Sequence, residues 1–341
     1  MDVYNLEEKE ENDWDAFISA MENATFYHQI GWKSVIEKTY KHKPYYLVAK
    51  EDGNIKGVLP LFLIASVIFG KKLVSIPFAP YGGVCGDDFE AENMLMIEAK
   101  RIAKITKSKY IELRNQNEKS RLLTNSTYVT FHIPLNVGSE VLWKRTSKGA
   151  RRSTKKAIRN NIEVLMGLRY LDDFYEMYAI RNNELGSPVH SYHFFKNILK
   201  EFPTQSNIQV AKFKDKIIGG KFLLFFRGTI TSGWASSDRR YKEYNPNNIL
   251  TWELIKYGCN NKYSCFDFGR SEWNSGTFRF KKAWAGSVIK PLYYQFYIPG
   301  SGEPPDFTQS SPMRQKFAMV WKRLPLSMTK AVGPIMRRNF P

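Results

Sequence analysis

The chain has 341 residues, of which 43% are hydrophobic and 15% aromatic, a composition typical of a folded globular protein and not of a disordered one. This length exceeds the usual size of a single hydrophobic core and predicts two domains. The formal net charge of +18 favours a polyanionic partner, such as RNA, a nucleotide-linked substrate or anionic lipid. Cys85, Cys259 and Cys265 lack paired spacing, so we expect neither a disulfide nor a zinc site.

The amino terminus and the most apolar stretch bear on localisation. The opening residues, MDVYNLEEKEENDWD, are acidic and lack the apolar core of a secretory signal. Residues 57–70 are too few to cross a bilayer and contain Pro60, so they are expected to form a buried strand. We therefore expect a cytoplasmic protein without a transmembrane helix.

Two segments of the chain resemble each other. Residues 46–64 (YLVAKEDGNIKGVLPLFLI) and 208–226 (IQVAKFKDKIIGGKFLLFF) each show two apolar runs around a short polar turn, which predicts a β-hairpin. The residues that recur 162 positions later are Val48, Ala49, Lys50, Ile55 and Gly57, as Val210, Ala211, Lys212, Ile217 and Gly219. Duplication of one domain is the favoured interpretation, and two unrelated halves with a chance hairpin match are the alternative.

The predicted elements follow the same order in both halves. In chain order they are helices at 13–21 and 29–40, the first hairpin, a helix at 91–107, a strand at 110–115, helices at 171–185 and 191–202, the second hairpin, a helix at 247–261 and a strand at 265–270. This plan resembles the N-acetyltransferase (GNAT) fold, present twice. We therefore expect an α/β (α+β) protein of tandem GNAT-like domains, each a mixed twisted sheet flanked by helices.

The expected domain limits follow from this plan. They are a first domain at 1–142, a second domain with a basic connecting helix at 143–298, and a basic tail or helix at 299–341.

Several motifs together resemble the FemAB-like aminoacyltransferases. They are YNPNNILTWELIKYGCNNKYSCFDFGRSEW (244–273), GTFRFKKAWAG (276–286), FYHQIGWKSVI (26–36), APYGGVCGDD (79–88) and KGARRSTKKAIRNN (148–161). Among FemAB-like proteins, the sequence most resembles the group found beside exosortase and exopolysaccharide systems. Two positions depart from members that use nucleotide-linked peptides: Ile36 stands where they have a lysine, and Tyr81 where they have an arginine.

The resemblance implies a reaction. FemAB-like proteins carry two acyltransferase-like domains and transfer an amino acid from aminoacyl-tRNA to an amine on a cell-wall peptide precursor. They need no metal or cofactor beyond the activated acyl donor, which is a substrate. For this chain the resemblance implies amide bond formation on an amine of a cell-envelope or exopolysaccharide precursor.

Lys281 is the main candidate catalytic residue, because Phe280 and Lys281 match the Phe-Lys pair of the family. An ammonium held near a tetrahedral intermediate stabilises the oxyanion, and a dry cleft strengthens that interaction. The segment is predicted to be a strand, in which Lys281 and Lys282 face opposite ways, so only one of them can point into the cleft. Phe280 is expected to fill the core beside the substrate.

Further candidates come from the same motifs. Asp87 is a candidate to orient the acceptor amine or accept its proton, although a helix cap is an equally good interpretation. Asp267 and Arg270 flank a glycine at a strand end and could contact substrate or form an internal ion pair. Trp32 matches the early motif, where packing is its expected role.

Residues 187–195 (SPVHSYHFF) bring His190 and Tyr192 together at the start of a helix. We expect them to be substrate contacts at most, because no nearby serine or cysteine motif supports a nucleophilic triad.

The connection between the halves, KRTSKGARRSTKKAIRNN (144–161), has eight basic residues and no acid. Three- and four-residue spacings can align several of them on one helical face, which suits an RNA backbone; a solvated helix is the alternative. The polyanion-binding candidates are Lys148, Arg151, Arg152, Lys155 and Arg159.

The last thirty residues are basic and aromatic, without an acid. They predict either peripheral contact with an anionic membrane, on its inner face, or a terminal helix that packs on the domains.

The sequence therefore predicts a FemAB-like acyltransferase whose partners are an activated acyl donor, such as aminoacyl-tRNA, and an amine acceptor that could be lipid-linked. A CoA-dependent N-acyltransferase is one alternative. It is disfavoured because the segment before the second-half helix, RRYKEYNPNNIL, has no glycine to hold a pyrophosphate. A non-catalytic scaffold that binds RNA or membrane is the other alternative.

Overall fold

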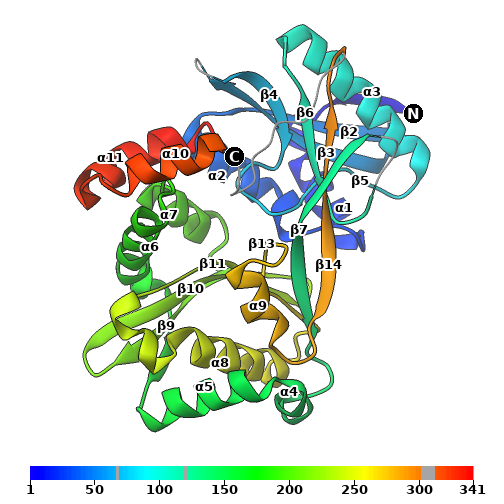
Figure 1. Cartoon of the computed structure of the whole chain (residues 1–341). Coiled ribbons are helices and arrows are strands. Elements are labelled where there is room, and N and C mark those ends of the chain that lie inside the picture. Colours follow the sequence, from blue (N-terminus) through cyan, green and yellow to red (C-terminus); the bar gives the residue numbers. More distant parts are fainter. Residues whose placement is uncertain (67–68, 119–121, 301–311, 341) are drawn as a thin grey trace. The chain divides into compact units, whose positions relative to one another are not determined.

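The computed structural model describes residues 1–66, 69–118, 122–300 and 312–340, and the chain divides into two compact units (Figure 1). Unit 1 comprises Met1–Thr127, a segment that begins at Pro291 and a segment that begins at Met336. Unit 2 comprises Tyr128–Lys290 and a segment that ends at Ile335. Each unit is a mixed sheet flanked by helices, as the sequence predicted.

The sheet of unit 1 has the strand order β1-β2-β3-β4-β6-β14, and β5 pairs with β3. Its strands are β1 (Asp2–Asn5), β2 (Lys43–Glu51), β3 (Asn54–Ser66), β4 (Gly70–Ser75), β5 (Cys85–Gly86), β6 (Ile111–Asn115) and β14 (Val288–Tyr297). Its helices are the 3-10 helices η1 (Glu8–Glu10) and η2 (Phe26–His28) and the α-helices α1 (Glu11–Ala20), α2 (Ile30–Tyr40) and α3 (Phe89–Thr106). Helix α3 packs on one face, while Trp14 of α1 contacts Tyr46 on the other.

The sheet of unit 2 has the order β7-β12-β11-β10-β9-β8, and β13 pairs with β7. Its strands are β7 (Leu123–Pro134), β8 (Glu163–Met166), β9 (Ser206–Phe213), β10 (Lys216–Phe226), β11 (Thr229–Ser237), β12 (Cys265–Asp267) and β13 (Ser271–Glu272). Its helices are α4 (Ser139–Arg145), α5 (Lys148–Arg159), η3 (Leu168–Tyr170), α6 (Leu171–Leu185), α7 (Tyr192–Glu201), η4 (Arg239–Tyr244), α8 (Pro246–Asn260), α9 (Gly276–Lys282), α10 (Pro312–Trp321) and α11 (Leu326–Arg337).

The structure contains both predicted hairpins, and both have a β-bulge at the same position. In β2 and β3, Ala49 pairs with Gly57 but Lys50 pairs with Ile55, so Lys56 is an extra residue. In β9 and β10, the pairs are Ala211 with Gly219 and Lys212 with Ile217, which leaves Ile218 as the extra residue. A β-bulge bends the strand that carries it and is a specific feature of a fold. The two hairpins therefore have the same register as well as a similar sequence.

Close helix packing explains why the glycine after each bulge recurs. A Cβ added at Gly57 would lie 3.2 Å from the Cβ of Ala91 on α3. A Cβ added at Gly219 would lie 2.9 Å from the Cβ of Pro246 on α8. In both units the helix that follows the hairpin therefore packs so tightly on the second strand that a side chain would force the two apart.

A parallel strand pair follows each hairpin. In unit 2, β11 runs parallel to β12 for three residue pairs, which end at Thr231 with Asp267, and β11 then continues without β12. In unit 1, β4 runs parallel to β6 in the same way, with Leu73 opposite Ile111. The loop that follows β12 lies against β11, where a Cβ added at Gly269 would be 2.9 Å from Ser232 O.

The structure also corrects the predicted secondary structure in two respects. A third strand, β4 or β11, follows each hairpin where the sequence plan had none. The segment around Lys281 was predicted to be a strand and is the helix α9. Its N-cap is Ser275, whose Oγ accepts a hydrogen bond from the backbone N of Phe278 at 3.1 Å. This cap starts a helix in a run whose alternation of aromatic and basic residues resembles a strand.

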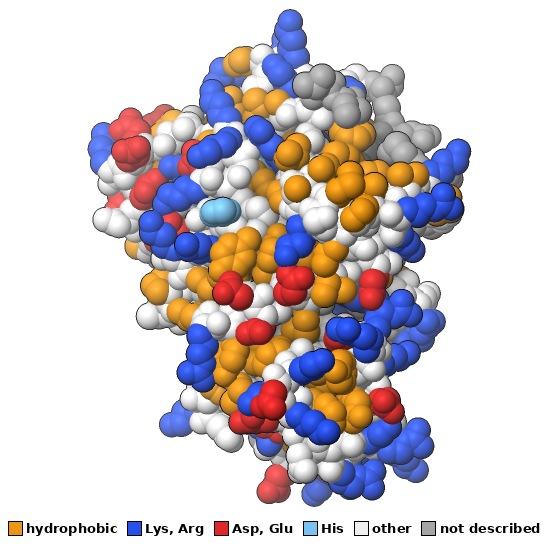
Figure 2. Space-filling model, turned by 90° about the vertical axis from the view of Figure 1, so that its left-hand side faces the viewer, with side chains coloured by type: hydrophobic (Ala, Val, Ile, Leu, Met, Phe, Trp, Pro, Cys, Tyr) orange, Lys and Arg blue, Asp and Glu red, His pale blue; other side chains and the backbone are white. Residues whose placement is uncertain are grey.

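The helices and the surface charge bear on contact with a membrane or a polyanion. Within the described ranges, no helix combines the length and the hydropathy needed to cross a bilayer. On the face of the molecule shown in Figure 2, Lys and Arg side chains are more widespread than Asp and Glu. This agrees with the excess of basic residues in the sequence.

Candidate functional site

Lys281 lies near the C-terminal end of α9 and reaches back to the loop after β12. Its Nζ donates hydrogen bonds to the backbone O of Gly269 at 2.8 Å and of Arg270 at 3.0 Å. Among the described residues, its third N–H has no protein acceptor. The neighbouring Lys282 is exposed. The ammonium is thus fixed by the backbone of one loop and keeps one donor for a ligand.

The environment of Lys281 lowers the pKa of its ammonium toward neutral pH. Burial lowers the pKa of Lys281 to about 7, the charge of Asp267 opposes this lowering and the charge of Arg270 adds to it. Lys281 is half-buried, and a partly shielded ammonium interacts more strongly with a developing negative charge than a fully exposed one does, because water screens it less. The environment therefore suits an electrostatic role and also makes the charge sensitive to pH.

Asp267, at the end of β12, organises the loop that holds Lys281. It is fully buried, its Oδ1 accepts hydrogen bonds from Thr130 Oγ1 and from the backbone N of Gly269, the latter at 2.8 Å, and its Oδ2 lies 3.6 Å from His132 Nε2. Gly269 has φ +69°, and a Cβ there would lie 2.9 Å from Ser232 O. The carboxylate and the glycine together set the path of the loop.

His132 on β7 faces this carboxylate. Burial lowers the pKa of His132, but the nearby Asp267, with a contribution from Cys265, raises it to about 10. Arg270, one residue after the glycine, is exposed, and its guanidinium lies 4.5 Å from the ring centroid of Tyr128. Asp267 therefore has a structural role in holding the loop, whereas Arg270 lies at the surface.

Lys221 on β10 is a residue that the sequence analysis missed. It is only 3% exposed, and its Nζ donates to Thr251 Oγ1 on α8 at 2.8 Å. Its Nζ also lies 5.5 Å from the ring centroid of Phe266 and 5.9 Å from that of Phe268. Burial lowers the pKa of Lys221 to about 7, and the charge of Lys281 adds to the lowering. A lysine inside the apolar run IIGGKFLLFF was the signal that could have identified it.

The other side-chain neighbours of the pair are aromatic. Phe266 and Phe268 are buried with ring centroids 4.4 Å apart, and Phe280 is partly buried against the same core as Trp284. The structure thus brings Phe280, Asp267, Arg270 and Lys281 together in unit 2, as a group of side chains around one loop. In the described part of the chain, no cluster of His, Cys, Asp and Glu could hold a metal ion.

Two candidates lie in unit 1. Asp87 is 40% exposed and its Oδ2 lies 3.6 Å from Lys56 Nζ. The helix cap considered for it belongs to Asp88, whose Oδ1 accepts from the backbone N of Ala91 at 2.7 Å at the start of α3. Trp32 is fully buried in α2 and packs edge-on against Tyr27 with ring centroids 5.0 Å apart. The packing expected for Trp32 is therefore its observed environment.

His190 and Tyr192 belong to the aromatic core between α6 and α7. His190 is fully buried and stacks on Phe194 with ring centroids 4.2 Å apart. Tyr192 donates its hydroxyl to Asp172 Oδ1 at 2.6 Å, and this hydrogen bond raises the pKa of Tyr192 to about 12. Neither contact indicates a catalytic role. Stacking on Phe194 holds the His190 ring, and the hydrogen bond to Asp172 holds the Tyr192 hydroxyl.

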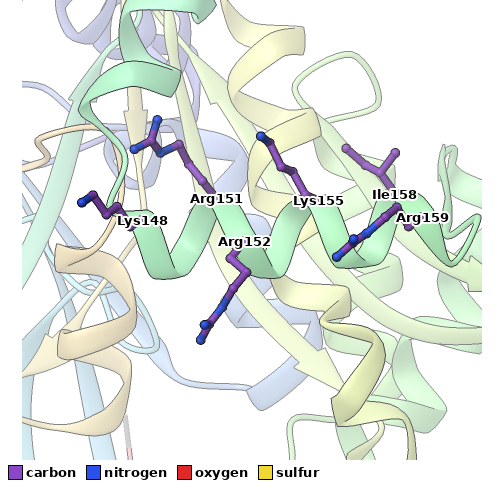
Figure 3. A pocket seen from close by; sticks show the side chains of 6 residues that line it. All are labelled: Lys148, Arg151, Arg152, Lys155, Ile158 and Arg159. Carbon is purple, nitrogen blue, oxygen red and sulfur yellow. The ribbon is translucent and has the colours of Figure 1, made fainter.

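The predicted basic run forms α5, which starts at the N-cap Ser147. Ala150, Thr154 and Ala157 are its buried face, and α5 packs on α8. Figure 3 shows the opposite side, where a surface hollow is lined by Lys148, Arg151, Arg152, Lys155, Ile158 and Arg159. Within the ranges that the structure describes, none of these basic side chains pairs with an acid.

Comparisons with known proteins agree with this architecture. Residues 144–282 match the acetyltransferase (GNAT) domain. FemX shares 15% identity with the chain over 95% of this chain and 100% of its own, with a TM-score of 0.68. The chain has the GNAT-type fold of the FemAB-like proteins. The resemblance to FemAB-like proteins predicted from the sequence is thereby confirmed for the fold.

Two further solved structures share this FemAB-like fold. L-PGS from Bacillus licheniformis is 12% identical and covers 94% of this chain and 99% of its own, with a TM-score of 0.55. A tandem GNAT protein from the clavulanic acid biosynthesis pathway is 10% identical, covering 89% of this chain and 99% of its own, with a TM-score of 0.53. No curated protein matches the chain at the sequence level. The match of residues 144–282 to the GNAT domain supports an acyltransferase.

Proposed function

We propose that the chain transfers an activated aminoacyl group to an amine and forms an amide bond, with the reacting carbonyl beside Lys281 in unit 2. The observation that carries this proposal is the position of the Lys281 ammonium, which two backbone carbonyls fix while one donor stays unused among the described residues. Such a donor, in a site shielded from water, stabilises the oxyanion that forms when an amine attacks an ester carbonyl.

The expected reaction needs positioning more than strong acids or nucleophiles. An aminoacyl ester is already activated, so holding the amine and the carbonyl in contact supplies much of the acceleration. Lys281 then stabilises the negative charge that develops on the carbonyl oxygen. We further propose that Phe280 and Arg270 border the substrate, because both belong to the segments that surround Lys281.

We propose a tRNA-like polyanion as the carrier of the acyl group. The supporting observation is the hollow on α5, where five basic side chains have no acidic partner in the described part of the chain. Repulsion between like charges makes such a cluster costly unless an anion offsets it, and a phosphodiester backbone supplies charges at regular intervals.

A CoA-dependent N-acyltransferase is the second candidate, favoured by the acetyltransferase (GNAT) domain match. In that case a pyrophosphate would need bare backbone amides at the start of α8. Pro246 occupies the first position of α8 and has no N–H, and it packs against Gly219. The backbone N–H of Asn248 donates to Asn245 O at 3.0 Å. These features disfavour CoA.

Identification of the molecules that co-purify with the full chain tests these proposals. We expect enrichment of tRNA, and we expect mass spectrometry to find an aminoacyl ester on it. Enrichment of CoA thioesters in place of tRNA would overturn the proposed donor and favour the second candidate. If the purified chain transfers no acyl group from either donor to any amine, the scaffold alternative replaces the enzyme.

The acceptor is proposed to be an amine on a cell-envelope or exopolysaccharide precursor, with a lipid link. The name FemX and the description of another structure with this fold, the C-terminal domain of a putative lysylphosphatidylglycerol synthetase, motivate this choice. That domain is 10% identical to the chain and has a TM-score of 0.54, so the likeness concerns the fold. A cytoplasmic enzyme that meets its acceptor at the inner face of the membrane remains our prediction.

We propose that the C-terminal helices contact that membrane. One side of them packs on unit 2: Trp321 is buried, and a Cβ at Gly333 would lie 2.8 Å from Val189 Cγ2. The other side carries apolar residues that are 39% to 67% exposed, namely Met319, Val320, Met328, Val332 and Ile335. Figure 2 looks onto the side where α10 and α11 lie in Figure 1, and hydrophobic and basic side chains are neighbours there. Exposed apolar and basic side chains together suit an anionic lipid surface.

Vesicle binding tests this contact. The full chain should sediment with vesicles of phosphatidylcholine and phosphatidylglycerol but not with phosphatidylcholine alone, because charge and apolar burial act together. Met328→Glu with Val332→Glu should lower this binding by about tenfold, since each change puts a negative charge against an anionic surface. Ile105→Glu on α3, where Ile105 is 64% exposed, is the matched control and should bind as the unchanged protein does. Equal binding by both variants would contradict the proposal.

A further inference from the structure

Lys221 presents a buried amine without a counter-ion. In the described part of the chain, its Nζ donates a hydrogen bond to Thr251 Oγ1 and lies near the rings of Phe266 and Phe268. A buried ammonium without an acidic partner is strongly disfavoured, so the environment favours the neutral amine with its lone pair.

The fold itself does not require a lysine at this position. The hairpin of unit 1 has the same register, and Leu59 pairs there with Leu47 as Lys221 pairs with Gln209 in unit 2. Leu59 is fully buried. An apolar side chain therefore fills the corresponding position of the same bulged hairpin, and packing alone gives no reason for an amine.

Lys281 differs from Lys221 in what holds its proton. Two backbone carbonyls accept from its Nζ, and the negative charge of Asp267 on β12 acts on it. The other charged groups around the pair are Arg270, whose charge opposes protonation of Lys281, and His132, whose charge is balanced by Asp267. When only one of the two lysines is charged, these contacts retain the proton on Lys281.

We propose that the buried Lys221 and the half-buried Lys281 form a pair of amines that carries one proton, in which Lys221 is the neutral partner that accepts the proton of the attacking amine. This inference rests on the proposed acyl transfer. The attacking amine nitrogen forms a bond to the ester carbonyl carbon and gives one proton to Lys221 Nζ. The C–O bond to the alcohol then breaks, and the proton passes from Lys221 to the departing oxygen. The products are an amide and a free alcohol, and both lysines return to their initial states.

The pair should give the reaction a bell-shaped pH profile. Lys221 has to be neutral to accept a proton, so the rate should rise as pH increases through the pKa of Lys221, which burial lowers to about 7. Lys281 has to be charged, so the rate should fall as pH rises further through its own lowered pKa. The two limbs belong to the pair, because the sites interact.

Carbon-13 NMR of the lysine side chains tests the shared proton without any substrate. In the unchanged protein, two lysines should titrate near neutral pH, well below the value of about 10.4 for ordinary lysines. In Lys281→Met one of these signals disappears, and the remaining signal, from Lys221, should titrate at higher pH because a like charge has been removed. Lys216→Met, an exposed change on the strand that carries Lys221, is the matched control and should leave both signals in place. Titration of all lysines above pH 9 would overturn the pair.

Kinetics test the role of Lys221 in proton transfer. With the donor identified by co-purification, Lys221→Met should lower kcat about 100-fold, leave KM nearly unchanged and remove the acidic limb of the profile. If Lys221→Met does not fold, Thr251→Val keeps both amines and should move the acidic limb to lower pH, since the hydroxyl that accepts from the ammonium is lost. An unchanged kcat and profile would overturn the role. Absence of any acyl transfer by the unchanged protein refutes the proposed function instead, whatever the NMR titration shows.

Discussion

Replacement of Lys281 by alanine should lower kcat for acyl transfer by about 100- to 1,000-fold, the range seen when one oxyanion donor is removed. KM for the acceptor should change little, because the ammonium acts mainly on charge that develops during the reaction. The loss of two hydrogen bonds to Gly269 O and Arg270 O should also destabilise the loop by roughly 1–3 kcal/mol. Rates measured by mass spectrometry of the amide product, together with circular dichroism, check both effects.

Lys282→Ala is the matched control for this experiment. It removes the same charge one residue later on α9, from an exposed side chain whose Nζ lies 6.0 Å from the ring centroid of Phe278. The Lys282→Ala variant should have a kcat within about twofold of that of the unchanged protein, because substitutions of exposed side chains usually have small effects. Equal activity of the two variants would show that the ammonium of Lys281 has no part in the reaction.

Reversal of charge in the hollow of α5 should weaken binding of deacylated tRNA. Lys155→Glu together with Arg152→Glu removes two cations and adds two anions on the face shown in Figure 3, and roughly a 100-fold loss of affinity is expected at low salt. The slope of log affinity against log salt should become shallower by about 0.7 to 0.9 for each phosphate contact that is lost. A filter-binding titration at several salt concentrations gives both quantities.

The chain contains a close control for this change as well. Lys156 is the neighbour of Lys155 on the same helix and is exposed, but it does not line the hollow. Lys156→Glu alters net charge by the same amount as Lys155→Glu, so it separates a local contact from the general attraction of a basic protein for RNA. If both single variants lose the same affinity, α5 binds RNA only through overall charge and the hollow is not a site.

Much of the fold could be predicted because its signals are local. Helical spacing identified α1, α2, α3, α6, α7 and α8, and the repeated pattern of two apolar runs around a polar turn identified both hairpins. The strands β4 and β11 were missed because short runs after a hairpin carry no distinct periodicity. The α9 segment was predicted to be a strand because aromatic and basic residues alternate there. In the structure it is a helix, which begins at the N-cap Ser275.

The site could be predicted only in part. Motif resemblance found Lys281 and the loop around Asp267, since both lie in one continuous segment. Lys221 and Thr251 come from a distant strand and helix, and their proximity to this segment arises from tertiary packing. Asp87 was a harder case, because two adjacent carboxylates share one loop and only the structure distinguishes the helix cap, Asp88, from its neighbour.

The bulge shared by the two hairpins bears on the history of the molecule. An extra residue at the same register, followed by a glycine under the same helix, is more simply inherited once than acquired twice. This shared feature favours duplication of one domain over two unrelated halves with a chance match. The first unit has a leucine where the second has an amine. The free-energy cost of burying that amine therefore falls on unit 2 alone, and unit 1 keeps an apolar interior at the corresponding position.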